Sequence, residues 1–188
     1  MPKNADPAER RQQVVTALYR VVDAEGLDAA SLPRIARELN ATTGLLQKYF
    51  RSKDELLLFA QDQLVEELTA SVQEVLNQEG GLQDQLREAL CAIALVGDAA
   101  RARVWLAFAA RAAANPVLLE RHKQGAQVVR DLCRHVLEAA GVDGEEAVGL
   151  AALVDGVTAQ RALEPEEMTE EVAERVIARH LERLWGST

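Results

Sequence analysis

Thr43, Gly44, Gln47 and Lys48 occur at spacings that place them on one face of a short helix. Each residue type suits a contact with double-stranded DNA. Gln can pair bidentately with adenine, Lys can reach guanine or a phosphate, and Gly lets the backbone approach closely. A hydroxyl from Thr42 or Thr43 at the helix start can reach a phosphate together with free backbone N–H groups. The spacing therefore indicates a helix that reads the major groove, although short helix pairs also occur in ordinary helical proteins.

Two short helices must position that face. Ser31 and Asn40 mark the ends of the first, because Ser caps helix N-termini and Asn tolerates the left-handed backbone conformation. Leu46 and Phe50, four residues apart, lie opposite the polar face of the second helix and can close a small core. Ala36 is small where the two helices would cross. Two short helices joined by a turn of about three residues have helix-turn-helix geometry.

Charge is distributed unevenly along the chain. The formal net charge is −9, and residues 61–188 carry 12 basic and 22 acidic side chains, a balance of −10. Residues 1–60 carry 9 basic and 8 acidic side chains, a balance of +1. Within 31–53 the balance is +4, because Glu38 is the one acid beside Arg34, Arg37, Lys48, Arg51 and Lys53. A basic head on an acidic body can contact phosphate through the head alone, although a merely solvated basic surface would give the same count.

The composition predicts an all-α protein. Ala and Leu contribute 58 of the 188 residues and aromatic residues contribute seven, so strong helix formers dominate and strand formers other than Val are scarce. Capping residues, glycines and prolines divide the chain into about nine helices, with a three-helix unit before a helical body. The expected starts and stops lie at Asp6–Glu9, Gly26, Ser31–Asn40, Thr42–Tyr49, Ser52–Glu55, Gln78–Gly81, Gly97–Asp98, Asn115–Pro116, Gly141, Asp143–Glu146, Glu164–Thr169 and Trp185–Gly186.

The segment Ser31–Leu56 resembles the DNA-binding segment of TetR-family transcriptional regulators, and an amphipathic helix over 14–25 precedes it as in that family. The resemblance implies an all-helical homodimer, with a DNA-binding unit over 1–52 and an effector-binding and dimerisation body over 53–188. The features that match in order and spacing are Ile35-Ala36, the Thr42/Thr43 helix start, Gly44, Leu46, Tyr49-Phe50 and Ser52-Lys53-Asp54-Glu55-Leu56.

The resemblance implies which residues contact DNA, with Tyr49 and Lys53 holding phosphate. The full set is Thr42, Thr43, Gly44, Gln47, Lys48, Tyr49 and Lys53. Two positions depart from the family pattern. The family often has Gly where this chain has Asn40, and an aromatic residue where this chain has Gln47. Gln47 in place of the aromatic residue thus either changes the base preference or removes a phosphate contact. We expect a repressor that a small-molecule effector of unknown identity releases from a palindromic operator.

The body is more loosely similar to the BetI-like branch of the family. The similar segments are Trp105-Leu106-Ala107-Phe108, Asn115-Pro116 and Leu153-Val154-Asp155-Gly156-Val157. In this family effectors bind inside the body, here among the helices over 53–140. The candidate lining residues are Phe59, Cys91, Trp105 and Phe108, each of which plain core packing would also explain. Arg101, Arg103 and Arg111 would either meet an anionic ligand or form a solvated helix face.

The last two helices carry the apolar side chains expected at a dimer interface. The resemblance implies that they pack against those of a second copy as a four-helix bundle. Packing within the monomer would use the same residues, so this alternative stays open. The residues are Leu150, Leu153, Val154, Val157, Val172, Val176 and Leu184.

The sequence lacks the common catalytic and metal-binding patterns. It contains no G-x-G-x-x-G, P-loop, H-E-x-x-H or G-x-S-x-G motif, and Cys91 and Cys133 have no metal or redox spacing. We therefore expect no enzyme, cofactor or metal site. No apolar stretch approaches the length of a membrane span and no secretory signal is visible, so we expect a cytoplasmic protein. The alternative is a helical ligand-binding or scaffold protein without DNA binding, which the basic window over 31–53 disfavours.

Overall fold

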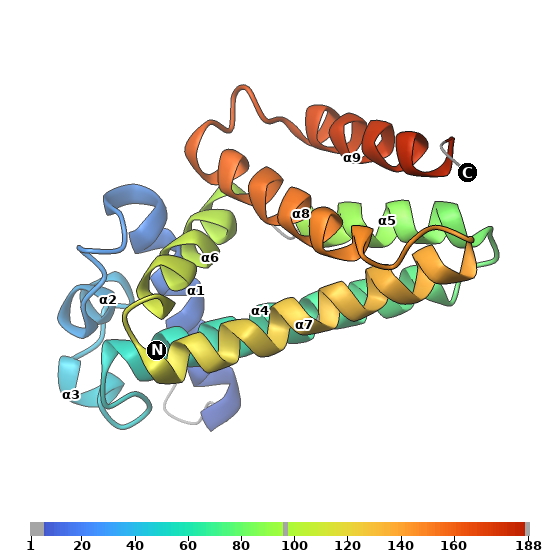
Figure 1. Cartoon of the computed structure of the whole chain (residues 1–188). Coiled ribbons are helices and arrows are strands. Elements are labelled where there is room, and N and C mark those ends of the chain that lie inside the picture. Colours follow the sequence, from blue (N-terminus) through green and yellow to red (C-terminus); the bar gives the residue numbers. More distant parts are fainter. Residues whose placement is uncertain (1–5, 96–97, 187–188) are drawn as a thin grey trace.

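The computed structural model describes residues 6–95 and 98–186, and these residues form nine α-helices and no strand (Figure 1). The all-α prediction is confirmed. No helix in the described ranges is both long and apolar enough to cross a bilayer. In chain order the helices are α1 Pro7–Glu25, α2 Leu32–Glu38, α3 Thr43–Leu46, α4 Lys53–Leu76, α5 Leu82–Ala94, α6 Ala99–Ala112, α7 Pro116–Ala139, α8 Glu146–Leu163 and α9 Glu170–Trp185.

A first hydrophobic core joins the three N-terminal helices to the body. Leu18 of α1, Ile35 of α2 and Leu46 of α3 are buried in this core. Leu56 of α4 and Phe108 of α6 enter the same core from the body. The helix-turn-helix unit is therefore braced by α4 and α6, and the core runs on across the junction between residues 52 and 53.

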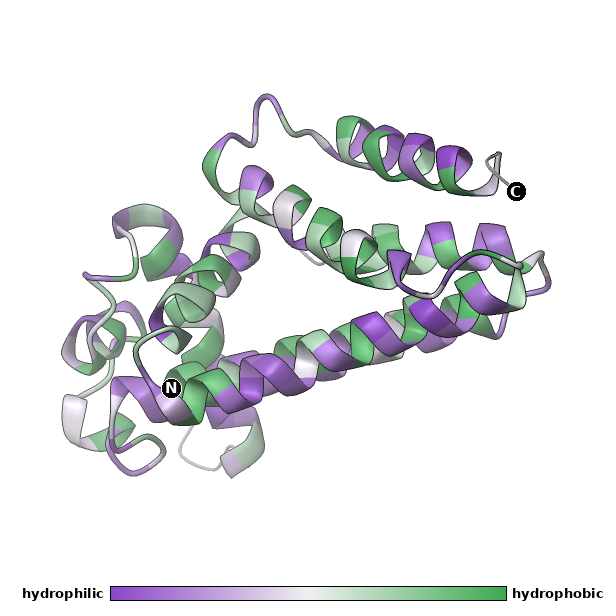
Figure 2. Ribbon diagram, in the orientation of Figure 1, coloured by the Kyte–Doolittle hydropathy of each residue, from purple (hydrophilic) through white to green (hydrophobic). Residues whose placement is uncertain are grey.

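A second core fills the rest of the body. It contains Leu90 of α5, Leu137 of α7, Leu150 of α8 and Ile177 of α9, all fully buried. Figure 2 shows apolar and polar residues alternating along these helices, as expected of helices that bury one face. The two cores place the three-helix unit at one end of the molecule and α9 near the other (Figure 1).

Side-chain caps begin most helices where the sequence predicts them. At α4, Ser52 accepts a hydrogen bond from the Glu55 N–H at 3.1 Å, and Glu55 Oε2 accepts one from the Arg51 N–H at 2.7 Å. This is the predicted capping box, with its return bond shifted by one residue. Asp143 instead caps a turn before α8, because it accepts from the Glu145 N–H at 3.0 Å. The other capping side chains are Asp6, Ser31, Thr42, Asp98, Asn115 and Thr169.

The helix α3 is shorter than the sequence predicts. The sequence pattern predicts a helix to about Tyr49, but α3 ends at Leu46. Beyond that point the N–H groups of Lys48 and Tyr49 donate to carbonyls three residues earlier, at 3.3 and 2.9 Å. Such bonds tighten the last turn as in a 3₁₀-helix. The tight turn reverses the chain toward α4 while Phe50 stays buried in the first core.

Asn40 is the one non-glycine residue of the described chain with a positive φ, at 51°. We expect Asn40→Ala to lower the free energy of unfolding by about 1 kcal/mol, because Ala adopts the left-handed conformation less readily than Asn does. Asn40→Gly should be neutral or slightly stabilising, since Gly adopts this conformation freely. Urea unfolding of both variants measures the difference. Equal losses for Ala and Gly would show that the Asn40 side chain acts in another way.

Candidate functional site

The outward face of α3 and the turn after it carries the predicted DNA-reading residues. Gly44, Gln47 and Lys48 are exposed, while Leu46 and Phe50 on the opposite side are each 1% exposed. A Cβ built on Gly44 would meet nothing within 4 Å, so packing inside the protein does not require glycine there. An open glycine on an exposed face is what close approach of a partner backbone would use.

The threonines and Tyr49 take more local roles. Thr42 caps α3, because its hydroxyl accepts a hydrogen bond from the Leu45 N–H at 3.3 Å. Thr43 and Tyr49 are half-buried, and Tyr49 packs against the first core. Thr42 is exposed, like Gly44, Gln47 and Lys48, whereas Thr43 and Tyr49 contribute only part of their side chains to this face.

Lys53 connects α4 to the loop between α1 and α2. Its Nζ donates a hydrogen bond to the Leu27 carbonyl at 2.5 Å. Burial, and secondarily the positive charge of Arg111, lowers the pKa of the Lys53 ammonium. In this conformation Lys53 holds the helix-turn-helix unit together, and it would have to leave Leu27 to contact a phosphate.

Fewer basic side chains of residues 31–53 point outward than the number of Lys and Arg residues there suggests. Arg34 forms ion pairs with Glu25 at 2.6 Å and Glu38 at 3.0 Å. Hydrogen bonds to these two carboxylates raise the pKa of Arg34 further. Exposed basic side chains around α3 are supplied by Arg37, Lys48 and Arg51.

A cavity of about 90 Å³ lies in the body between α4, α5, α6, α7 and α8. Its wall is mostly apolar and includes Leu64, Ile93 and Val154, which are buried. Trp105 of α6, one of the four effector candidates, also lines it. A mostly apolar wall with a few polar groups is typical of a ligand site, and the volume is smaller than the roughly 300–1,000 Å³ of most such sites.

Asp155 is the one acidic residue among the described residues that line the cavity. Burial raises the pKa of its carboxyl group, and His122 and Arg130 partly counter this effect. His122 also lines the cavity, as does Gln61, which is 7% exposed. Motif reasoning missed Asp155, although a charged residue inside the apolar run over 153–157 was a signal for it.

The other three effector candidates lie elsewhere. Phe108 is buried in the first core, and Phe59 packs there with its ring centroid 5.4 Å from that of Phe50. Cys91 is half-buried against the second core. None of the three side chains lines the cavity. The helices α4, α5 and α6 each bury more than one face, and these side chains point into the cores instead.

The dimer candidates divide into two groups. Leu150, Val154 and Val157 of α8 are buried in the second core of the monomer, so their side chains do not reach the outer surface. The partly exposed members are Leu153, Val172, Val176 and Leu184, of which Leu153, Val176 and Leu184 also pack against that core.

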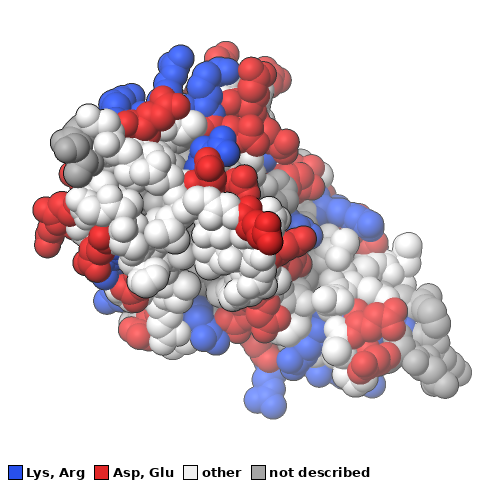
Figure 3. All heavy atoms as spheres, turned by 90° about the vertical axis from the view of Figure 1, so that its right-hand side faces the viewer, with Lys and Arg blue, Asp and Glu red and all other residues white. Residues whose placement is uncertain are grey.

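The outer face of α8 carries a different apolar stripe. Val148 and Leu163 are 56% and 65% exposed at its two ends, and Ala152 and Gly156 are exposed between them, beside the exposed side chain of Asp155. Figure 3 views the end of the body away from α1–α3 and shows a broad area without Lys, Arg, Asp or Glu, bordered by many acidic side chains. The surface of the body is thus acidic, with uncharged areas available for contact.

Two family models match the chain. The model described as bacterial regulatory proteins, tetR family, matches residues 14–59, and the model described as BetI-type transcriptional repressor, C-terminal, matches residues 81–186. Among curated proteins, the HTH-type transcriptional regulator BetI of Vibrio campbellii is 30% identical and covers 97% of this chain and 96% of its own. The HTH-type transcriptional regulator PksA of Bacillus subtilis is 29% identical and covers 98% and 94%.

Solved structures share the fold. A transcriptional regulator from Rhodococcus sp. Rha1 has a TM-score of 0.85 and 27% identity, covering 94% of this chain and 96% of that one. A transcriptional regulator from Saccharomonospora viridis in complex with choline has a TM-score of 0.71 and 20% identity, covering 93% and 96%.

The two thiols are predicted to be unreactive at neutral pH. Burial raises the pKa values of Cys91 and Cys133 to about 11. Because the thiolate is the reactive form, we expect slow alkylation by iodoacetamide at pH 7 and a rate that rises about tenfold per pH unit up to the pKa. Mass spectrometry of the folded protein measures this, with the urea-unfolded chain as control. A rate that levels off near pH 8.5 would contradict the raised pKa values.

Proposed function

The chain belongs to the TetR family of bacterial transcriptional regulators, and from this premise we propose that it is a repressor. A homodimer binds an inverted-repeat operator through its two helix-turn-helix units, and a small organic cation in the body cavity releases it. The observation that carries the DNA-binding part is the exposed Gly44, Gln47 and Lys48 face opposite the buried Leu46 and Phe50.

The reading face fits a major groove chemically. Gln47 can offer its amide to adenine and Lys48 can reach guanine or a phosphate. Arg37 and Arg51 are exposed near the same helix and supply sequence-independent attraction to the DNA backbone. The acidic body is repelled by DNA, so contact is restricted to the head.

The dimer contact is proposed to involve the outer stripe of α8. Val148, Ala152, Gly156 and Leu163 form an exposed apolar stripe, and the small residues at its centre let a second helix approach closely. Together with the partly exposed residues of α9, this stripe would complete a four-helix bundle with the partner. Such a dimer would present two α3 helices to successive major grooves about 34–36 Å apart.

The cavity chemistry favours a cationic effector. Asp155 supplies a carboxylate in a mostly apolar wall, and Trp105 supplies an aromatic ring. A compact cation with apolar substituents would gain an ion pair from the first and a cation–π contact from the second. The Saccharomonospora viridis regulator in complex with choline supports a ligand of this class. A ligand that binds the DNA-free conformation better would shift operator affinity by about 5- to 150-fold.

The DNA-binding function predicts recovery of an inverted repeat from a random pool of duplexes incubated with the purified protein. On the recovered duplex, Gln47→Ala should relax preference at one base pair, by about 1–3 kcal/mol if Gln47 pairs bidentately. Lys48→Ala should weaken binding, whereas Lys123→Ala, an exposed lysine on α7, should not. A folded protein that enriches no duplex would favour the helical ligand-binding alternative.

The residues that line the cavity predict that ligand binding depends on the charge of the ligand. We expect wild-type protein to bind choline better than its neutral analogue 3,3-dimethylbutan-1-ol in calorimetry, and Asp155→Asn to weaken choline roughly tenfold, or about 1.4 kcal/mol. Asp131→Asn, an exposed α7 residue, is the matched control. Choline binding should weaken as the pH falls through the raised pKa of Asp155, because protonation removes the negative charge. Equal binding of both ligands would exclude the cationic class.

A further inference from the structure

Three arginines of α6 contact carboxylates of other helices. Their sequence positions are compatible with an anionic ligand or with a solvated helix face, but the structure pairs each with an acid of this chain. The pairs are Arg101 with Glu67 of α4 at 3.1 Å, Arg103 with Asp23 of α1, and Arg111 with Asp54 of α4 at 2.6 Å.

Arg103 differs from the other two because its partners lie on α1 and α8. Its Nη1 forms the ion pair with Asp23 near the end of α1. Its Nε donates a hydrogen bond to the carbonyl of Ala162, near the end of α8, at 3.3 Å. The planar guanidinium group can serve both acceptors because its N–H groups point in fixed, different directions. Arg103 thus connects the DNA-binding unit to the helix that carries the proposed dimer stripe.

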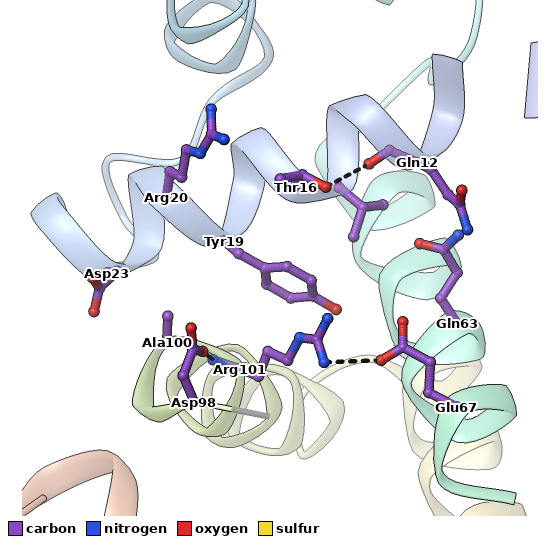
Figure 4. A pocket seen from close by; sticks show the side chains of 11 residues that line it. Gln12, Thr16, Tyr19, Arg20, Asp23, Gln63, Glu67, Asp98, Ala100 and Arg101 are labelled. Atoms are coloured by element: carbon purple, nitrogen blue, oxygen red, sulfur yellow. Dashed lines mark hydrogen bonds and ion pairs between the residues drawn. The ribbon is translucent and has the colours of Figure 1, made fainter. Parts of the chain in front are cut away.

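The packing around this connection is open. A cleft of about 350 Å³ separates α1 from α4 and α6 beside it, lined mostly by polar side chains (Figure 4). Figure 4 shows Arg101 reaching across this cleft toward Glu67, beneath the ring of Tyr19. The Arg101 guanidinium lies 5.8 Å from the Tyr19 ring centroid. On this side, therefore, charged contacts from α6 hold α1 against the body where apolar packing is interrupted.

We propose that Arg103 is a positioning residue that sets the distance between the two reading helices of the dimer. This inference rests on the proposed function. In a dimer joined through α8, the placement of each α3 depends on how its three-helix unit is held relative to α8. The Asp23–Arg103–Ala162 contact is a direct link between the two, so its loss removes one constraint on the angle at which the unit is held, while the shared apolar core remains.

The position of Arg103 also suits control by a ligand. Trp105, two residues further along α6, lines the body cavity. A ligand that displaces Trp105 moves the same helix segment that carries Arg103. The side chains of Arg103 and Asp23 are 35% and 52% exposed, and a pair so exposed to water breaks readily.

The test measures spacing preference, which a general loss of stability would not change. The probes are the selected inverted-repeat duplex and two versions with one base pair inserted or removed between the half-sites. We expect wild-type protein to prefer the selected spacing, and Arg103→Ala and Asp23→Asn each to reduce that preference about fivefold or more. Arg121→Ala is the matched control, because it breaks an ion pair of similar exposure with Asp62 inside the body, at 2.9 Å.

Further outcomes separate this inference from the proposed function. Arg103→Lys keeps the charge but not the fixed fork of donors, so we expect it to restore the spacing preference only in part. If Arg103→Ala lowers affinity for all three duplexes by the same factor, or if Arg121→Ala has the same effect on the preference, the positioning role is wrong while the DNA-binding function stands. If wild-type protein recovers no duplex, the proposed function fails and the inference falls with it.

Discussion

The burial of two side chains four residues apart, Leu46 and Phe50, determines how the molecule can meet a partner. Both are 1% exposed in a core that also holds Phe108 of α6 and Leu56 of α4. Since the apolar side of α3 must point into this core, its opposite side must point outward. The helix itself is too short to be stable alone, so its shape and direction are imposed by the core beneath it.

The same core explains why the reading head does not move independently of the body. Leu56 and Phe108 enter it from helices that continue into the body, so the head is attached by shared apolar packing as well as by the chain. On the side of the cleft near Tyr19 this packing gives way to charged contacts. Apolar packing is costly to disrupt, whereas exposed ion pairs contribute little and rearrange easily. The head is thus held in both ways, by apolar packing in the first core and by charged contacts beside the cleft.

The helix α6 combines three environments within one short segment. Arg103 faces α1 and α8, Trp105 faces the body cavity, and Phe108 is buried in the first core. Successive helical residues point about 100° apart, so side chains two and three positions apart can serve separate neighbours. A change at any one of these surfaces is transmitted to the others, because the backbone of a helix moves as a unit.

The sequence alone determined the features that depend on near neighbours in the chain. The capping side chains, the left-handed Asn40, the all-helical composition and the opposed faces of α3 follow from local hydrogen bonding and the helical repeat, and the structure reproduces them. Packing between segments far apart in the chain makes Trp105 line the cavity and buries Phe108 in the first core. The same packing brings Asp155 to that cavity and buries Leu150 within the monomer. An apolar residue on a helix is driven out of water whichever partner covers it. Its periodicity therefore predicts burial but not the partner, which is set by contacts between segments far apart in the chain.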